Sequence, residues 1–250
     1  MLSSVGVTTM QSDLLVLDVS PLVWRSAMGA ADEPKPELAF ERMLVRILDE
    51  HPHSRAVAAL DCKGPTWRHL AYPPYKGRRP EVPGVVREVK KYHRNVVLGK
   101  LGISWYHYPL AEADDIIASF AAQTLNATVI TPDKDMYSIL GINGTKIYDD
   151  SQKVWWSEDH CMEKHGVRPD QMPDYLAMAG DRVDNIPGIS KIGPKKAAAL
   201  LKKYNSVEGL YRQLAADNTG LKTIEKKLWA VEFEVRLYKQ LTSLCMDLPL

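Results

Sequence analysis

The sequence predicts an α/β fold in which helices flank a mostly parallel central sheet, followed by a helical subdomain. Three short apolar runs, at residues 14–17, 56–60 and 127–130, each lead into an aspartate, and stretches with helical spacing separate them. Such runs are typical of strands that are buried on both faces of a parallel sheet. From about residue 159 the chain changes to helical stretches around a glycine-rich loop, which indicates a separate helical unit.

The remaining elements follow from the spacing of apolar residues. Residues 38–50 and 116–125 have the periodicity of amphipathic helices that would connect the strands. Residues 103–106 and 146–148 are weaker strand candidates. Further helices are expected at residues 172–179, 194–204 and 225–244.

The length and composition set limits on the organisation of the chain. With 250 residues and 45% hydrophobic content, it can form one core plus a small subdomain. We expect a flexible tail at residues 1–12, an α/β domain at 13–158 and a helical subdomain at 159–250. No apolar run reaches the roughly 18 to 20 residues of a membrane span, and the N-terminus has no secretory signal pattern. Three widely spaced cysteines argue against a disulfide framework and fit a reducing cytoplasm.

Charge is segregated along the chain although the formal net charge is only +1. Residues 63–100 hold ten Lys or Arg and two acids, a local charge of +8, and residues 186–203 hold five lysines and no acid. The balancing acids lie elsewhere, many of them in small groups. A neutral chain with this segregation can hold an anionic polymer together with multivalent cations.

The acids gather where predicted strands end. The three clearest strands lead into Asp18, Asp61 and Asp133, and the carboxyl ends of parallel strands are where ligands bind in open sheets. Convergent carboxylates need cations to offset their repulsion, and hard oxygen ligands suit Mg²⁺ or Mn²⁺. Two such ions can support an in-line displacement at phosphorus. The nine candidate metal ligands are Asp18, Asp61, Glu112, Asp114, Asp115, Asp133, Asp135, Asp181 and Asp184.

Each acid taken singly has an ordinary structural explanation. Acids in a first helical turn, such as those at residues 112–115, are favoured by the helix dipole. Asp133 and Asp135, or Asp181 and Asp184, could serve as turn residues or helix caps. The combination of all nine favours the metal site over these alternatives.

A basic segment at residues 68–79 mixes cations with aromatic rings. Arg68, Lys76 and Arg79 suit phosphates, and Tyr72 and Tyr75 suit unstacked bases. A solvated surface loop explains the same composition equally well. Because the segment has few apolar anchors, Lys76 is expected to be mobile until substrate binds.

A glycine-rich hairpin follows near residue 188. Its form, with two glycines ahead of a proline at the first position of a helix, is typical of a helix-hairpin-helix that binds DNA without sequence preference. This unit is expected at about residues 172–204. Its candidate DNA-binding residues are Gly188, Ser190, Lys191, Gly193, Lys195 and Lys196, in addition to Arg68 and Tyr72.

With these motifs in this order, the chain resembles the 5′ nuclease family. This family includes flap endonucleases, bacteriophage 5′–3′ exonucleases and the 5′-nuclease domain of bacterial DNA polymerase I. The most specific stretches are Glu-Ala-Asp-Asp at residues 112–115, Thr-Pro-Asp-Lys-Asp at 131–135 and Gly-Asp-Arg-Val-Asp-Asn-Ile-Pro-Gly-Ile at 180–189. The resemblance covers about residues 14–244. One departure is Val-Ser-Pro at residues 19–21, where the family often has a Gly and an Asn.

The resemblance implies a 5′-nuclease-like (PIN) fold and roles for matching residues. The implied ligands of a first metal ion are Asp18, Asp61, Glu112 and Asp114. Those around a second ion are Asp133, Asp135, Asp181 and Asp184, with Asp115 as a supporting acid. The implied phosphate-binding residues are Arg25, Lys76 and Arg79, with Tyr75 beside them. Residues 68–94 would form an arch or clamp, and the hairpin would bind duplex DNA and can hold a K⁺ ion.

The sequence therefore predicts a stand-alone, structure-specific 5′ nuclease. Its expected partner is DNA with a free 5′ end, flap or overhang, and RNA in hybrids is left open. No membrane partner is expected, a monomer is the default, and the expected location is the cytoplasm of a bacterial or phage-infected cell. The alternatives are an aspartate-based phosphatase, which would leave the hairpin unexplained, and a non-catalytic DNA-binding scaffold.

Overall fold

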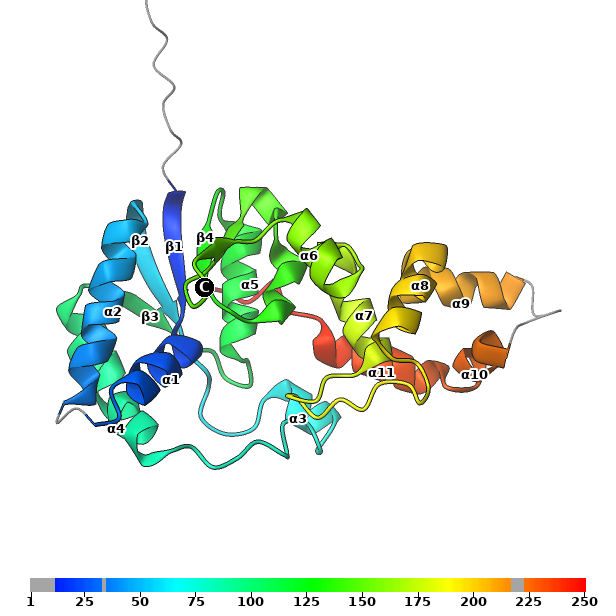
Figure 1. Cartoon of the computed structure of the whole chain (residues 1–250), viewed down its shortest axis with the longest axis horizontal. Helices are drawn as coiled ribbons and strands as arrows, with labels where there is room; N and C mark the ends of the chain where they lie inside the picture. Colours follow the sequence, from blue (N-terminus) through cyan, green and yellow to red (C-terminus); the bar gives the residue numbers. More distant parts are fainter. Residues whose placement is uncertain (1–11, 33–34, 217–222) are drawn as a thin grey trace, which may run out of the picture.

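The computed structural model describes residues 12–32, 35–216 and 223–250, so almost all of the predicted N-terminal tail lies outside the described residues. A six-stranded sheet of order β3-β2-β1-β4-β5-β6 forms the centre of the first domain (Figure 1), and only the β5–β6 pair is antiparallel. The strands are β1 (Ser12–Asp18), β2 (His53–Ala59), β3 (Ser104–Tyr106), β4 (Thr128–Ile130), β5 (Lys146–Asp149) and β6 (Val154–Trp155). The predicted α/β class with a mostly parallel sheet is confirmed.

Helices cover both faces of this sheet. The helices of the first domain are α1 (Val19–Gly29), α2 (Pro36–Glu50), α3 (Trp67–Ala71), α4 (Gly84–Tyr92) and α5 (Ala113–Gln123). Its shorter helical turns are η1 (His93–Leu98), η2 (Lys134–Ile139) and η3 (Ile142–Gly144). Helix α1 was not among the helices expected from the sequence. Pro21 is the third helical residue, where the missing N–H would have no intrahelical acceptor in any case.

The strand side chains alternate between two cores. Leu14 and Val16 of β1 point into a core that includes α5 and the helical subdomain, whereas Leu15 and Leu17 point into a core that includes α1, α2 and α4. This alternation follows from the two-residue repeat of a strand. It explains why the first strand is continuously apolar rather than amphipathic.

The helical subdomain extends from one end of the α/β domain (Figure 1). Its elements are α6 (Glu158–His165), η4 (Pro169–Gln171), α7 (Met172–Ala179), α8 (Pro194–Tyr204), α9 (Val207–Ala216), α10 (Thr223–Ala230) and α11 (Glu232–Thr242). The single closing helix predicted at residues 225–244 is two helices that are separated at Val231, whose φ of −126° is not helical. No helix among the described residues has the length and apolar content to cross a membrane.

The last eight residues return to the α/β domain. Ser119 and Gln123 on α5 donate hydrogen bonds to the carbonyls of Cys245 and Leu248, at 3.2 and 2.8 Å. The chain therefore ends beside α5 rather than on the helical subdomain (Figure 1). The sequence-based boundary at residue 159 did not anticipate this return.

The segment predicted as an arch, residues 68–94, has two separate anchors. Its first end is α3, beside α11, and its second end is α4, whose Val86 and Val89 are buried in the core with α1 and α2. Residues 72–83 span the distance between these helices (Figure 1). The segment therefore runs along the molecule as a strap whose second helix is packed on the α/β core.

Candidate metal centre and nucleic-acid interface

Parallel strands bring the first acids to one edge of the sheet. Asp18 is the last residue of β1 and pairs in register with Ala59 at the end of β2, two residues before Asp61. Ile130, at the end of β4, pairs with Leu17, so Asp133 follows at a similar level. Helix α5 begins at the same edge, with Glu112 as its N-cap and Asp114 in its first turn.

Asp18, Asp61, Asp114 and Asp133 form what we call the first acid group. Burial, and then the neighbouring Asp133 and Asp61, raise the pKa of Asp18 to about 8, although a 2.7 Å hydrogen bond from Thr131 Oγ1 opposes the shift. Burial and the same type of repulsion, from Asp133 and Asp18, raise the pKa of Asp114 well above its usual value. These carboxylates are close enough to penalise their common ionisation, as expected of a site that takes cations.

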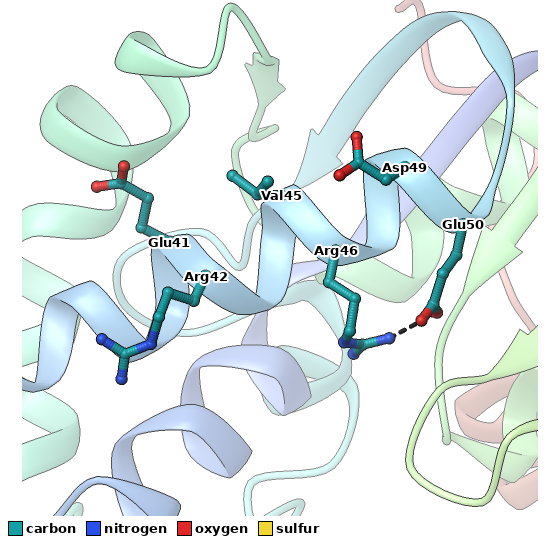
Figure 2. Close-up of a pocket in the computed structure, with 6 residues that line it drawn as sticks. All are labelled: Glu41, Arg42, Val45, Arg46, Asp49 and Glu50. Carbon is teal, nitrogen blue, oxygen red and sulfur yellow. Dashed lines mark hydrogen bonds and ion pairs between the residues drawn. The ribbon is translucent and has the colours of Figure 1, made fainter.

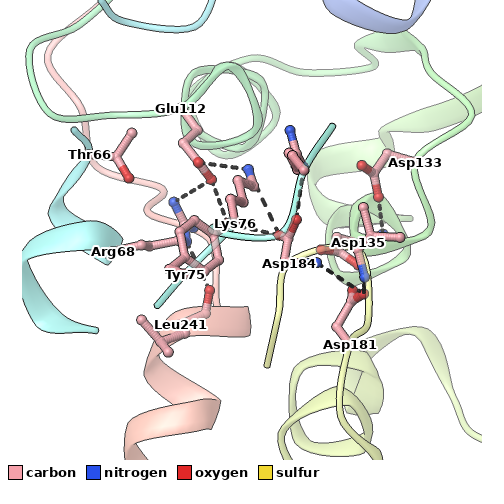
Figure 3. Close-up of polar contacts among 12 residues, drawn as sticks. Thr66, Arg68, Tyr75, Lys76, Glu112, Asp133, Asp135, Asp181, Asp184 and Leu241 are labelled. Carbon is pink, nitrogen blue, oxygen red and sulfur yellow. Dashed lines mark hydrogen bonds and ion pairs between the residues drawn. The ribbon is translucent and has the colours of Figure 1, made fainter. Parts of the chain in front are cut away.

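Asp135, Asp181 and Asp184 form the second acid group (Figure 3). Lys134 Nζ lies 2.6 Å from Asp181 Oδ2 and 3.1 Å from Asp135 Oδ1. Arg79 Nη2 lies 2.8 Å from Asp184 Oδ1. Burial and Asp133 raise the pKa of Asp135 to about 7, and Lys134 limits that rise. Here the protein supplies its own cations.

Lys76 lies between the acids rather than in a mobile loop. Its ammonium is 2.7 Å from Glu112 Oε1 and 3.8 Å from Asp184 Oδ2, and its backbone N–H donates to the Asp184 carbonyl at 2.9 Å. Tyr75 is buried beside it, and its hydroxyl lies 2.9 Å from Glu112 Oε2 and 2.8 Å from Asp184 Oδ2. The expectation of a mobile Lys76 is wrong, because these contacts hold the backbone and the ammonium (Figure 3).

Two sequence-based assignments are corrected by burial. Arg68, expected to bind DNA, is 2% exposed, and its guanidinium donates to both oxygens of Asp115 at 2.7 and 2.8 Å. It also donates to the carbonyls of Leu241 and Ser243 at 2.8 and 2.9 Å. Asp115, expected to support the metals, further accepts the backbone N–H of Cys245 at 3.0 Å. With both oxygens occupied and no solvent access, this pair joins α3, α5 and the end of α11 instead.

Arg25 and Tyr72 also have partners within the protein. Arg25 forms an ion pair with Asp150, a buried carboxylate just after β5 that also pairs with Arg46 and Lys153. Tyr72 is half-buried and packs edge-on against Tyr238, with ring centroids 6.1 Å apart. Both side chains therefore make contacts within the protein in this structure.

The glycine hairpin has the predicted helix-hairpin-helix form between α7 and α8. Gly188 has φ of +64°, and a Cβ atom there would lie 2.4 Å from the backbone nitrogen of Gly180, so only glycine permits this close approach. Ser190, Lys191, Gly193, Lys195 and Lys196 are all exposed. Lys196 Nζ donates to the Lys191 carbonyl at 2.9 Å. Exposed lysines around the N-terminus of α8 suit phosphate contacts.

The fit of a metal ion can be judged from the donor chemistry. In the described ranges, no three His, Cys, Asp or Glu side chains are arranged closely enough to hold an ion. The members of the first acid group repel one another, and ammonium and guanidinium groups pair with the second. The candidate donors are nevertheless all carboxylates, and each disfavours the ionisation of its neighbours. Such a set of oxygen donors suits hard divalent cations.

Two residues of the site were not singled out from the sequence, although both lie in the Thr-Pro-Asp-Lys-Asp stretch at residues 131–135. Thr131 orients Asp18, and its hydroxyl oxygen accepts the Asp133 N–H at 3.1 Å. Lys134 supplies the cation of the second acid group. Their position next to Asp133 and Asp135 in the sequence was the available signal. Polar residues adjacent to predicted metal ligands could have been predicted as part of the site.

A hollow on one face of α2 is lined by none of these acids, and Figure 2 shows the residues that line it. Charges of both signs alternate along this face at helical spacing, and Arg46 pairs with Glu50 at 2.6 Å. Such pairs are typical of a solvated helix face. We assign it no function. Its lining residues are Glu41, Arg42, Val45, Arg46, Asp49 and Glu50.

Comparison with protein families assigns both parts of the chain. The family described as "5'-3' exonuclease, N-terminal resolvase-like domain" matches residues 14–166, and the one described as "5'-3' exonuclease, C-terminal SAM fold" matches residues 167–250.

Individual relatives agree with this assignment. The chain is 31% identical over 246 residues to a 5'-3' exonuclease of Aquifex aeolicus, which covers 94% of this chain and 84% of that relative. Flap endonuclease Xni of Yersinia enterocolitica is 32% identical over 248 residues, covering 96% of each chain. A thermostable DNA polymerase I of Thermus thermophilus is 31% identical over 216 residues, which are 84% of this chain and 25% of the polymerase.

Solved structures show the same fold. T5 5'-exonuclease with bound divalent metal ions (zinc) has a TM-score of 0.78 and 20% identity, covering 93% of this chain and 90% of that chain. The catalytic core of Rad2 in complex with DNA substrate has a TM-score of 0.59 and 16% identity, covering 92% and 78%.

Proposed function

The chain belongs to the 5′–3′ exonuclease family, as its motifs predicted, and from this premise we propose that it is a metal-dependent 5′ nuclease that hydrolyses DNA at or near a free 5′ end or flap. One observation carries the proposal. Acids from three strand ends, the start of α5 and the 180–193 loop meet at one edge, and Lys76 lies among them.

The proposed cofactor is Mg²⁺, for which Mn²⁺ can substitute, because the candidate donors are carboxylates. The first acid group with Glu112 would hold one ion, and the second acid group with Asp133 would hold another. When bound, such ions activate water and stabilise charge at phosphorus. A K⁺ ion at the hairpin would replace the Lys196 ammonium, which lies 2.9 Å from the Lys191 carbonyl.

The protein side chains have separate roles in this proposal. Thr131 orients Asp18 through a 2.7 Å hydrogen bond. Lys76 and Arg79, which now pair with Glu112 and Asp184, would transfer these contacts to the scissile phosphate and stabilise the charge that develops on it. The Tyr75 hydroxyl lies between the Glu112 and Asp184 carboxylates and donates its one proton to one of them at a time.

The hairpin would hold the duplex next to this site. Its exposed lysines and close-packed glycines support contact with the DNA backbone, independent of sequence. RNA in hybrids is compatible with such backbone contacts. A monomer acting in the cytoplasm of a bacterial or phage-infected cell completes the proposal. Relatives named for exonuclease and flap endonuclease activity support the nuclease function.

The test is a 5′-labelled flap duplex incubated with Mg²⁺ or with EDTA. Release of a labelled DNA fragment with Mg²⁺ alone is the expected result. Release of inorganic phosphate without strand cleavage would identify a phosphatase. Duplex binding without any cleavage, in Mg²⁺ and in Mn²⁺, would identify a non-catalytic scaffold.

A further inference from the structure

A cavity of about 490 Å³ lies beside Asp61, on the β2–β3 side of the sheet edge. Three cationic or ring-nitrogen side chains line it, and each comes from a different element. Lys63 follows β2, Arg94 belongs to η1, and His107 directly follows β3. Of the described residues that line this cavity, none is a carboxylate. The cavity therefore suits an anion.

The cation and ring contacts around the cavity are already organised. The Trp105 ring stacks on the His107 ring, with centroids 5.7 Å apart and an interplanar angle of 17°. The Arg94 guanidinium lies over the same Trp105 ring, 5.4 Å from its centroid. Trp105 remains 37% exposed. Trp105 therefore positions the His107 ring and the Arg94 guanidinium, and cations held in place in this way suit the phosphate of an unpaired nucleotide.

The cavity is continuous in sequence with the acid edge. Asp61 of the first acid group immediately precedes Cys62 and Lys63, which line the cavity. Its carboxylate accepts hydrogen bonds from the Ala113 N–H at 3.1 Å and from the Ser20 hydroxyl at 2.7 Å. A strand with one phosphate at the acids can thus extend its neighbouring nucleotide into the cavity.

The position of the cavity in the fold gives the strand a direction. The order β3-β2-β1-β4 puts the cavity beyond β2, whereas the hairpin and α8 lie at the opposite end of the molecule (Figure 1). If the duplex is held by the hairpin, DNA that passes the acids and reaches the cavity has left the duplex. On a 5′ nuclease, this DNA is the unpaired 5′ side of the cleaved bond.

We propose that this cavity binds the phosphate of an unpaired nucleotide on the 5′ side of the cleaved bond, through Lys63, Arg94 and His107. The inference rests on the proposed nuclease function. The phosphate could be the terminal 5′-phosphate or an internal phosphate of a longer flap, and both present the same oxygens to the cavity.

The test uses the double variant Lys63→Ala with His107→Ala, since both side chains are exposed and their loss leaves the core intact. Lys100→Ala is the matched control, because this exposed lysine pairs with Glu41, outside the cavity. Three duplexes are compared: a single unpaired 5′ nucleotide with a 5′-phosphate, the same with a 5′-hydroxyl, and a five-nucleotide flap with a 5′-hydroxyl.

The double variant should lose about tenfold in kcat/KM, as one or two charge contacts imply, while the control stays at the wild-type value. A loss confined to the 5′-phosphorylated end identifies the terminal phosphate as the ligand, and a loss on the five-nucleotide flap identifies an internal phosphate. Equal loss on all three substrates, or no loss on any, overturns the proposal.

A binding measurement separates this inference from the proposed function. Fluorescence anisotropy of a labelled 5′-phosphorylated oligo-dT of five nucleotides, in EDTA, requires no cleavage. Suppose that the wild-type protein cleaves nothing with Mg²⁺ but binds this probe about tenfold more tightly than the double variant. The nuclease proposal is then wrong, and the assignment of the cavity as a nucleotide-binding site is supported. Equal affinities for the wild-type protein and the double variant remove the cavity assignment even if cleavage is normal.

Discussion

The two acid groups at the sheet edge differ in how their negative charge is offset. In the second acid group, Lys134 lies 2.6 Å from Asp181 and Arg79 lies 2.8 Å from Asp184. In the first, Asp18 and Asp114 lie close to Asp133, and the pKa values of both are raised by burial and by this repulsion. Within the described part of the chain, no Lys or Arg forms an ion pair with a member of the first group.

This difference separates two ways of keeping carboxylates together. The second acid group is stabilised by the protein itself, so a divalent ion must compete there with Lys134. The first acid group has hydrogen bonds, such as that from Thr131 to Asp18, and the charge of Lys76, which lowers the pKa of Asp18 and Asp114 without pairing with either, so added cations should stabilise it most. Asp133 connects the two, since it raises the pKa of Asp18 in one group and of Asp135 in the other.

The largest expected effect comes from that shared acid. Asp133→Asn should lower metal-dependent cleavage by more than about 10³-fold, beyond the range of one lost electrostatic contact, because both groups lose a ligand. The melting temperature in EDTA should stay the same or rise, since a repelling charge is removed. Asp149→Asn is the matched control, as Asp149 ends β5 at the same edge but caps its own turn through Ser151. Near-normal cleavage by Asp133→Asn would contradict the two-group interpretation.

Lys76 tests whether the cation between the groups acts on the transition state. Lys76→Ala should lower the single-turnover rate about 10²- to 10³-fold and change the dissociation constant little. Arg79→Ala should have a smaller effect of the same kind, because the Arg79 side chain is half exposed and, among the described residues, forms an ion pair with Asp184 alone. Single-turnover kinetics at saturating enzyme measure both. If affinity falls while the saturated rate holds, Lys76 is a surface cation that only concentrates DNA.

The hairpin lies outside both groups, so its contribution should not depend on metal. Lys195→Ala with Lys196→Ala should weaken duplex affinity about tenfold and reduce the salt slope by about 0.9 for each lost phosphate contact. The loss should be the same in EDTA and in Ca²⁺, and for every duplex sequence. Lys202→Ala, at the other end of α8, is the control. A loss that appears only with divalent ions would place the duplex on the acid groups instead.

The smallest expected effect isolates the second acid group. Lys134→Met removes the cation that competes for Asp135 and Asp181, so Mn²⁺ should bind about fivefold more tightly, the equivalent of about 1 kcal/mol for a partly exposed pair. The melting temperature in EDTA should fall because two acids lose their counter-charge. Electron paramagnetic resonance of free Mn²⁺ measures the affinity. An unchanged affinity would show that Lys134 and the ion do not share ligands.

Much of the sheet could be predicted from the sequence because its strands are buried on both faces. The apolar runs before Asp18, Asp61 and Asp133 have no amphipathic alternation, and a parallel sheet then puts their ends at one edge. The failures were local. Helix α1 was not predicted, and the break at Val231 was missed because no proline or glycine marks it in the sequence.

The partners of the charged residues were settled only by the tertiary structure. Arg68 was assigned to DNA and Asp115 to metal on the basis of their types and neighbours, yet they pair with each other across 47 positions. Arg25 and Asp150 pair across 125 positions. Sequence spacing can indicate that an acid lies at a strand end or a helix start, because these are local properties. Whether that acid binds a metal, a substrate or an arginine depends on which distant segments bury it. Residues 243–250 and α11 pack over the Arg68–Asp115 pair, and this burial makes the pair inaccessible to metal and to DNA.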